Sequence, residues 1–118
     1  MTFLPFEEAS SNTMLKNFLK YVGPSNADGF AVYGWTATLA FKQALDNIVT
    51  KDGVNGLTSF NAGGMIGTVD IKDKVPTPCA ALVQLKSGKF VRVSPSRKGT
   101  FNCDKSNAVQ IKADLISG

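Results

Sequence analysis

The chain has 118 residues and a formal net charge of +4, with 43% hydrophobic and 19% charged residues, a composition typical of one small ordered domain. The absence of histidine excludes Ser-His-Asp and Cys-His nucleophile systems, His-ligated haem and every zinc site that needs imidazole. Two cysteines are too few for a four-thiolate zinc site or an all-cysteine iron–sulfur cluster within one chain. We therefore expect neither enzymatic activity nor a cofactor.

The excess positive charge is dispersed along the chain, and only Arg92 and the pair Arg97-Lys98 lie close together. A nucleic-acid footprint normally gathers basic residues on one face, with stacking aromatic side chains nearby. A solvated basic surface is the simpler interpretation, so no nucleic-acid partner is expected. The acidic residues, including the neighbours Glu7 and Glu8, are likewise expected to be solvated.

No apolar run approaches the ~20 residues needed to cross a bilayer. The first eight residues also lack the basic-then-apolar order of a signal peptide. Two alternatives follow from these observations. The protein is either cytosolic, or it is a mature or trimmed piece of an exported protein.

Helical periodicity dominates residues 7–52. A short amphipathic helix is predicted from about residue 10 to residue 21, where apolar side chains repeat at helical spacing. Ser11 or Asn12 can cap its start, and Gly23-Pro24 ends it.

A long helix is predicted from the cap Asp28 to about Thr50. Its apolar stripe is broad, which predicts a largely buried helix. Phe41 and Leu45 lie at the centre of that stripe, so truncation of either is expected to be severe.

Strand and turn signals replace the helical period over residues 60–112. The glycine-rich segment 61–67 is interpreted as a structural turn, because it lacks the Lys-Ser/Thr pair of a phosphate-binding loop. A short strand is predicted at 66–71 and a last one at 108–111.

A β-hairpin is the clearest signal in this half. Strand-like residues 80–85 and 90–93 flank a polar turn that contains Gly88, a residue able to adopt a positive φ. This hairpin separates Cys79 from Cys103 and returns the chain towards its start. A disulfide between them would contribute about 3–4 kcal/mol and imply an extracytoplasmic compartment. Two buried free thiols are the alternative.

Four segments in chain order carry a family resemblance. They are residues 14–21 (ending FLKY), residues 28–37 (DGFAVYGWTA), residues 61–67 (NAGGMIG) and residues 82–91 (LVQLKSGKFV). In this order they resemble the C-terminal portion of type 1 periplasmic substrate-binding proteins of ABC transporters, the branched-chain amino-acid-binding group. The resemblance covers roughly residues 6–111.

The resemblance implies an α/β fragment of a two-lobed fold in which three segments cross between the lobes. Residues 1–118 would form a single partial domain, with two helices followed by short strands and a C-terminal hairpin. The family usually has another helix before the glycine-rich turn, and here only residues 51–59 are available for it.

The implied function is that of a solute-binding component, or a C-terminal fragment of one, which binds an amino acid or a similar small molecule. In the family an aromatic residue at the start of the long helix approaches the ligand, and Phe30 matches that position, with Tyr33 as a weaker neighbour. The implied partners are the solute, a membrane permease, and either the missing remainder of the protein or a second copy of the chain.

The implied location is periplasmic or extracellular, with a possible membrane anchor in a missing N-terminal part. The export implied by the resemblance also favours the Cys79–Cys103 disulfide. The alternative function is a small secreted interaction module that pairs through the edge of its β-hairpin. A basic nucleic-acid binder is the least favoured interpretation.

Overall fold

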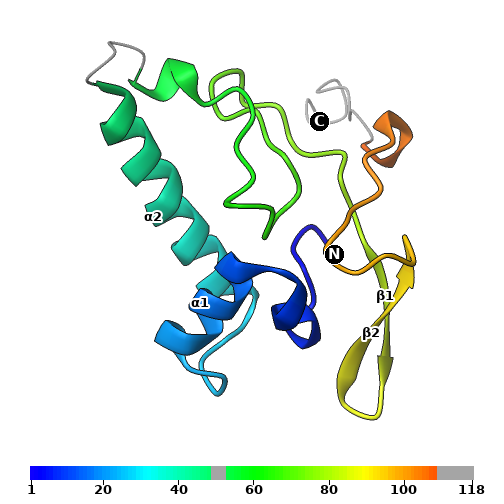
Figure 1. The fold of residues 1–118 in the computed structure, drawn as a ribbon. Helices are drawn as coiled ribbons and strands as arrows, with labels where there is room; N and C mark the ends of the chain where they lie inside the picture. Colours follow the sequence, from blue (N-terminus) through cyan, green and yellow to red (C-terminus); the bar gives the residue numbers. More distant parts are fainter. Residues whose placement is uncertain (49–52, 109–118) are drawn as a thin grey trace, which may run out of the picture.

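The computed structural model describes residues 1–48 and 53–108 (Figure 1). It is a small α/β domain in which the α-helices precede a two-stranded antiparallel sheet, as the sequence predicted. The elements in chain order are η1 (Phe6–Ser11), α1 (Thr13–Val22), α2 (Gly29–Ile48), η2 (Gly53–Gly56), β1 (Leu82–Lys86), β2 (Lys89–Ser94) and η3 (Lys105–Asn107).

Helix α1 begins and ends where its sequence provides caps. The Asn12 side-chain oxygen accepts a hydrogen bond from the Leu15 amide at 2.9 Å. The helix ends at Gly23, which has a φ of 85°. Its apolar face buries Leu15 and Phe18. The short helix η1, which directly precedes α1, was not predicted.

Helix α2 is capped by Asp28 as predicted, since the Asp28 carboxylate accepts a hydrogen bond from the Ala31 amide at 2.7 Å. Its predicted end near Thr50 lies outside the described residues. The prediction of a largely buried helix is wrong. One face packs against the core, and Ala44 is buried near η2, but the opposite face is exposed over the whole length of the helix. The exposed apolar side chains are Phe30, Tyr33, Phe41, Leu45 and Ile48.

The physical reason is that α2 has two apolar faces and only one packing layer among the described residues. Its inner face contributes Val32, which is fully buried, and Trp35, which is half-buried. Trp35 meets the Phe18 ring edge-on at 5.9 Å between centroids and stacks on Tyr21 at 6.4 Å.

The core lies between the two α-helices and the loop that follows η2. Phe18 is at its centre, because it also meets the Phe6 ring at 5.8 Å between centroids. The buried residues that form this cluster are Leu4, Leu15, Phe18, Val32, Phe60, Ala62 and Met65.

The predicted strand at 66–71 does not form as a regular strand. Three isolated bridges occur instead, Phe3 with Ile66, Phe60 with Val69 and Asp70 with Val75, so successive residues pair with different segments. Close packing at Gly67 contributes to this irregularity. A Cβ atom there would lie 2.6 Å from the Cβ atom of Cys79, so only glycine fits without displacement.

The predicted hairpin is confirmed as β1 and β2. Lys86 pairs with Lys89 and Leu85 with Phe90, which leaves Ser87 and Gly88 as the turn. Both turn residues have positive φ, 51° and 74°, as a two-residue turn of the type I′ class requires. The predicted strand at 108–111 lies, apart from residue 108, outside the described residues.

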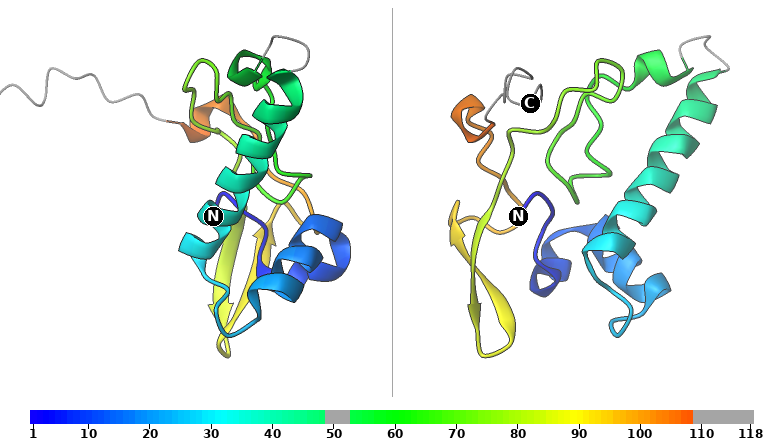
Figure 2. Two further views of the ribbon diagram at one scale, coloured as in Figure 1. Left: turned by 90° about the vertical axis from the view of Figure 1, so that its left-hand side faces the viewer. Right: turned by 180° about the vertical axis from the view of Figure 1, so that it is seen from behind.

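The N-terminal residues 1–4 join the two halves of the domain. Met1 exchanges two backbone hydrogen bonds with Ala81 on the hairpin side. On the helical side, the Leu4 amide donates to the Met65 carbonyl, and the Gly67 amide donates to the Thr2 carbonyl, both at 2.9 Å. The helices and the hairpin lie on opposite sides of this segment (Figure 2).

Helix α2, the longest helix, is not a membrane span: none of the helices within residues 1–48 and 53–108 combines the length and apolar character needed to cross a bilayer.

We expect Phe18→Ala and Phe41→Ala to differ sharply in stability, which corrects the expectation drawn from the sequence. Phe18 is fully buried, and its truncation should lower the free energy of unfolding by about 3–5 kcal/mol. Phe41 is 65% exposed, so its truncation should cost less than about 1 kcal/mol. Urea unfolding at low protein concentration measures both values. Equal losses in the two variants would contradict this assignment of the core.

Candidate functional site

The predicted disulfide between Cys79 and Cys103 is present and spans 24 residues of sequence. Beside it, Ala80 and Asn102 exchange two backbone hydrogen bonds at 2.8 and 2.9 Å. The bond therefore fastens the start of the hairpin to the segment after it. A disulfide of this kind suggests an oxidising compartment, extracellular or periplasmic.

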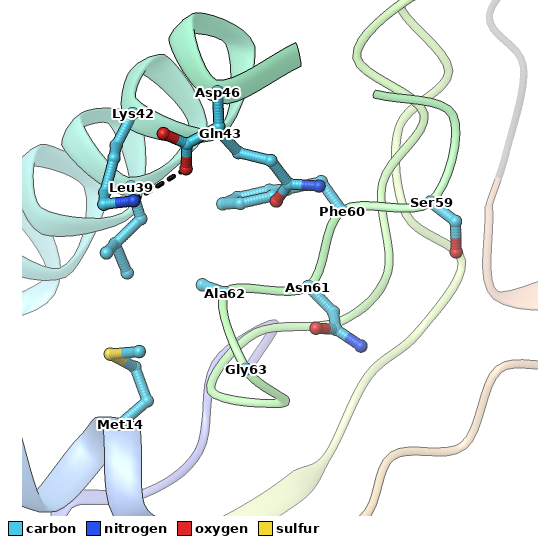
Figure 3. A pocket seen from close by; sticks show the side chains of 10 residues that line it. All are labelled: Met14, Leu39, Lys42, Gln43, Asp46, Ser59, Phe60, Asn61, Ala62 and Gly63. Atoms are coloured by element: carbon cyan, nitrogen blue, oxygen red, sulfur yellow. Dashed lines mark hydrogen bonds and ion pairs between the residues drawn. The ribbon is translucent and has the colours of Figure 1, made fainter. Parts of the chain in front are cut away.

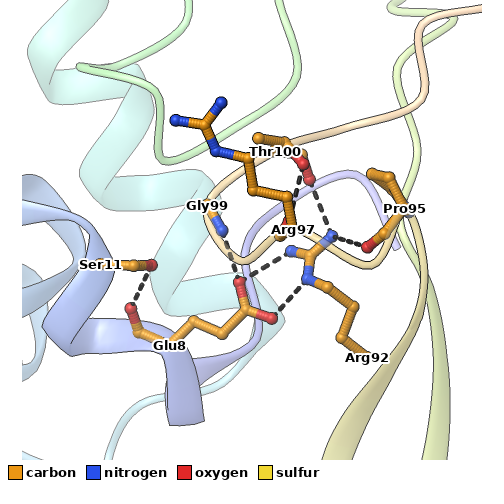
Figure 4. Close-up of polar contacts among 7 residues, drawn as sticks. All are labelled: Glu8, Ser11, Arg92, Pro95, Arg97, Gly99 and Thr100. Carbon is orange, nitrogen blue, oxygen red and sulfur yellow. Dashed lines mark hydrogen bonds and ion pairs between the residues drawn. The ribbon is translucent and has the colours of Figure 1, made fainter.

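The most buried charged groups of the described chain are Glu8 in η1 and Arg92 in β2 (Figure 4). Each side chain is only 4% exposed. The guanidinium of Arg92 binds both carboxylate oxygens of Glu8, through Nε at 2.5 Å and Nη2 at 2.8 Å. The Gly99 amide donates a further hydrogen bond to the same carboxylate at 2.9 Å.

Arg92 forms further hydrogen bonds through its other terminal nitrogen. Its Nη1 donates to the Thr100 carbonyl at 2.8 Å and, at 3.5 Å, to the Pro95 carbonyl. The expectations of a solvated Glu8 and of a solvated basic cluster that includes Arg92 are therefore wrong. Neither residue carries a local signal of this contact, because 84 positions separate them in the sequence.

The environment of Glu8 favours its charged form. Burial raises the pKa of the Glu8 carboxyl, but the hydrogen bonds from Arg92 and the Gly99 amide, together with the positive charges of Arg92 and Lys98, outweigh it. The pKa therefore lies below its usual value. A carboxylate that is held charged and fully hydrogen-bonded stabilises the structure rather than exchanging protons with a substrate.

The two residues predicted to contact a ligand, Phe30 and Tyr33, lie on the outer face of α2 one turn apart. Phe30 is 86% exposed and Tyr33 is 58% exposed. Neither lines the cavities described below. Their role as ligand contacts remains a prediction.

One cavity of about 450 Å³ lies between α1, α2 and the glycine-rich turn (Figure 3). Leu39 and Phe60 contribute apolar wall, and Lys42 and Asp46 stand at its edge, joined by an ion pair of 2.6 Å. A cation and a carboxylate beside an apolar wall suit a zwitterion, but here they satisfy each other. The further lining residues are Met14, Gln43, Ser59, Asn61, Ala62 and Gly63.

A second cavity, of about 440 Å³, lies between the start of α2 and the tip of the hairpin. Three aromatic rings line it, those of Phe3, Phe6 and Phe90, and two carboxylates, those of Glu7 and Asp28. We call it the interhalf cleft, because its walls come from both halves of the domain. Aromatic rings with carboxylates suit an organic solute that carries a positive charge.

Sequence reasoning missed the interhalf cleft. Its only sequence signal is the recurrence of Phe3 and Phe6 before the acidic Glu7, and Phe90 joins them only through the fold. No cluster of three or more cysteine, aspartate or glutamate side chains suited to a metal ion occurs among the described residues.

Comparisons with protein-family models, with curated proteins and with solved structures give no match to this chain.

We expect the Glu8–Arg92 pair to dominate the acid sensitivity of the fold. Because the pKa of Glu8 is depressed in the folded state, its stabilisation is complete above the ordinary value of 4.5 and is lost as the pH falls through the folded pKa. Glu8→Gln should lower the free energy of unfolding by about 3–5 kcal/mol at neutral pH, because it leaves the buried Arg92 unpaired.

Urea unfolding across pH 3–7 tests this expectation, with the exposed neighbour Glu7→Gln as the matched control. The double variant Glu8→Gln/Arg92→Met should recover part of the loss, because no charge then remains buried. A Glu8→Gln variant with the stability and the pH profile of the parent chain would show that the pair is unimportant.

Proposed function

We propose that this chain is the solute-binding component of an ABC importer, or a C-terminal fragment of one, with an amino acid or a similar small molecule as its ligand. The order of its elements supports this proposal. The helices α1 and α2, the glycine-rich turn and the hairpin fall on the four segments that carry the family resemblance. The disulfide is consistent with the exported location that such a component needs.

The main support for the proposal is that residues 1–4 cross between the two halves of the domain. Residues 1–4 lie between residues 65–67 and Ala81 and form backbone hydrogen bonds with both. A binding protein of the resembled type has three segments that cross between its lobes. Closure of two bodies about such segments is a common way to trap a small solute.

The interhalf cleft is the place for the solute in this proposal. It opens beside the crossing segments, and it has one wall at Asp28 and Gly29, immediately before Phe30. The apolar part of a solute would contact Phe3, Phe6 and Phe90. Its amino group would face the carboxylates of Glu7 and Asp28, each of which has one oxygen besides the one that already accepts a backbone hydrogen bond.

Among the described residues that line the cleft, none has a cationic side chain for the carboxylate of an amino acid, and the ammonium group of Met1 already donates to the Ala81 carbonyl. We therefore expect this chain alone to bind amino acids more weakly than about 1 mM, and to bind their decarboxylated amines no worse. Titration of the labelled chain, followed by NMR, should shift the amide signals of Gly29 and Phe90. Phe90→Ala should abolish the shifts, whereas Leu82→Ala, at the far end of the same hairpin, should not.

Two results would refute parts of this proposal. Unmoved signals at Gly29 and Phe90 with every solute at high concentration would remove the cleft as the solute site. Micromolar binding of one amino acid by a strictly monomeric chain would show that no further part of a binding protein is needed. An intact-mass measurement beside the encoding reading frame would show directly whether a longer product exists.

A second candidate function, pairing through the hairpin edge, is favoured by the backbone of β1. In this register Val83 and Leu85 direct their amide and carbonyl groups away from β2. The outer edge of β2 is different, because the Phe90 amide already donates to Glu7 at 2.9 Å. The open edge of β1 could add a strand from another protein.

Hydrogen exchange of the dilute monomer tests this open edge. The amides of Val83 and Leu85 should exchange rapidly, whereas those of Gln84 and Lys86, which face β2, should be protected. Slow exchange at Val83 and Leu85 in the monomer would mean that the edge is already covered.

A further inference from the structure

The outer face of α2 has five exposed apolar side chains along its length. Phe30, Tyr33, Phe41, Leu45 and Ile48 are all exposed, and their spacing places them on one stripe about 27 Å long. We call these five residues the α2 stripe. Helix η2 packs near the C-terminal end of α2 and leaves Leu45 and Ile48 exposed. Contiguous apolar patches of this size usually mark an interaction surface.

The stripe is complementary to itself when two copies run antiparallel. A two-fold axis that crosses the stripe at the height of Leu39 along the helix would place Phe30 against Ile48 of the second copy and Tyr33 against its Leu45. Phe41 would then meet Ala37, which is small and exposed.

The shape of the helix near the axis suits this register. Gly34 precedes Ala37 by one turn, and a Cβ atom at Gly34 would meet nothing within 4 Å. The helix surface is therefore hollow where the Phe41 ring of the second copy would insert. Phe41 projects from the next turn with 65% of its surface exposed.

The area of the stripe is sufficient for a weak specific dimer. Its three aromatic and two aliphatic side chains present roughly 500–600 Å² per copy, so a symmetric pair that covered all of it would bury at most about 1,000–1,200 Å² in total. That area is at the lower end of specific interfaces, so we expect a weak, reversible dimer.

Charge does not oppose this contact. Residues 29–41 contain no charged side chain, so an antiparallel pair brings no like charges together along this stretch. The nearest charges, Lys42 and Asp46, form an ion pair with each other on the flank that faces the cavity of Figure 3. A protein with a net charge of +4 therefore has a neutral face through which two copies can approach.

From these observations we infer that a second copy of this chain covers the α2 stripe, with the two α2 helices antiparallel about an axis that crosses the stripe at the height of Leu39. The inference uses neither the interhalf cleft nor a solute, so it stands or fails apart from the proposed function.

Sedimentation equilibrium of the full chain between about 1 µM and about 500 µM should show a reversible monomer–dimer equilibrium. Phe41→Glu should weaken the dimer about a hundredfold, because each dimer contains the substitution twice. Leu85→Glu is the matched control, since Leu85 on the hairpin is also 65% exposed. It should leave the equilibrium unchanged, and both variants should retain the unfolding transition of the parent chain.

Introduced cysteines test the register. Cys79 and Cys103 are bonded to each other, so an added cysteine is the one free thiol of the chain. Thr38→Cys lies beside the axis and should cross-link rapidly under mild oxidation. Phe30→Cys should not, because about 27 Å along the axis would separate the two copies of that position.

Three results would overturn the inference. A monomer at every concentration would mean that no second copy covers the stripe, as expected if another part of a longer protein does so. A dimer lost in Leu85→Glu but kept in Phe41→Glu would place the contact at the hairpin. Cross-linking of Phe30→Cys without cross-linking of Thr38→Cys would exclude the antiparallel register.

Discussion

The buried pair of Glu8 and Arg92 joins segments that the chain keeps far apart. Arg92 projects from β2, Glu8 from the short helix before α1, and the loop through Gly99 and Thr100 closes around both. Burial of two charges is costly unless every lone pair and donor is used, and here the carboxylate and guanidinium satisfy each other and the nearby backbone. The hairpin can therefore adopt only one position against the N-terminal segment.

That position creates the interhalf cleft. The hairpin tip lies across the N-terminal segment from the start of α2, and there Phe90 lines the cleft together with Phe3 and Phe6. Arg92, two residues further along the same strand, binds Glu8. The disulfide restrains the other end of the hairpin. Strand β2 thus supplies both the buried cation and an aromatic wall of the candidate solute site.

Helix α2 is apolar on two faces, and only one of them packs against the core of this domain. Its inner face, through Val32 and Trp35, completes the core with Phe18. Its outer face is as apolar but is not covered among the described residues. A helix that is apolar on two faces belongs between two layers. The described residues supply one layer, and a second copy of the chain would supply the other in the dimer inferred above.

The sequence by itself determined the features that depend on neighbouring residues: the cap Asp28, the approximate positions of both α-helices and the hairpin turn at Ser87-Gly88. Side-chain capping and positive φ act within a few residues, so their signals are local. Only the tertiary structure decided which apolar residues are buried, as the exposed Phe41 shows, and that Glu8 is paired rather than solvated. Burial and ion pairing depend on which distant segments meet, and that is a property of the whole packed chain rather than of any short stretch.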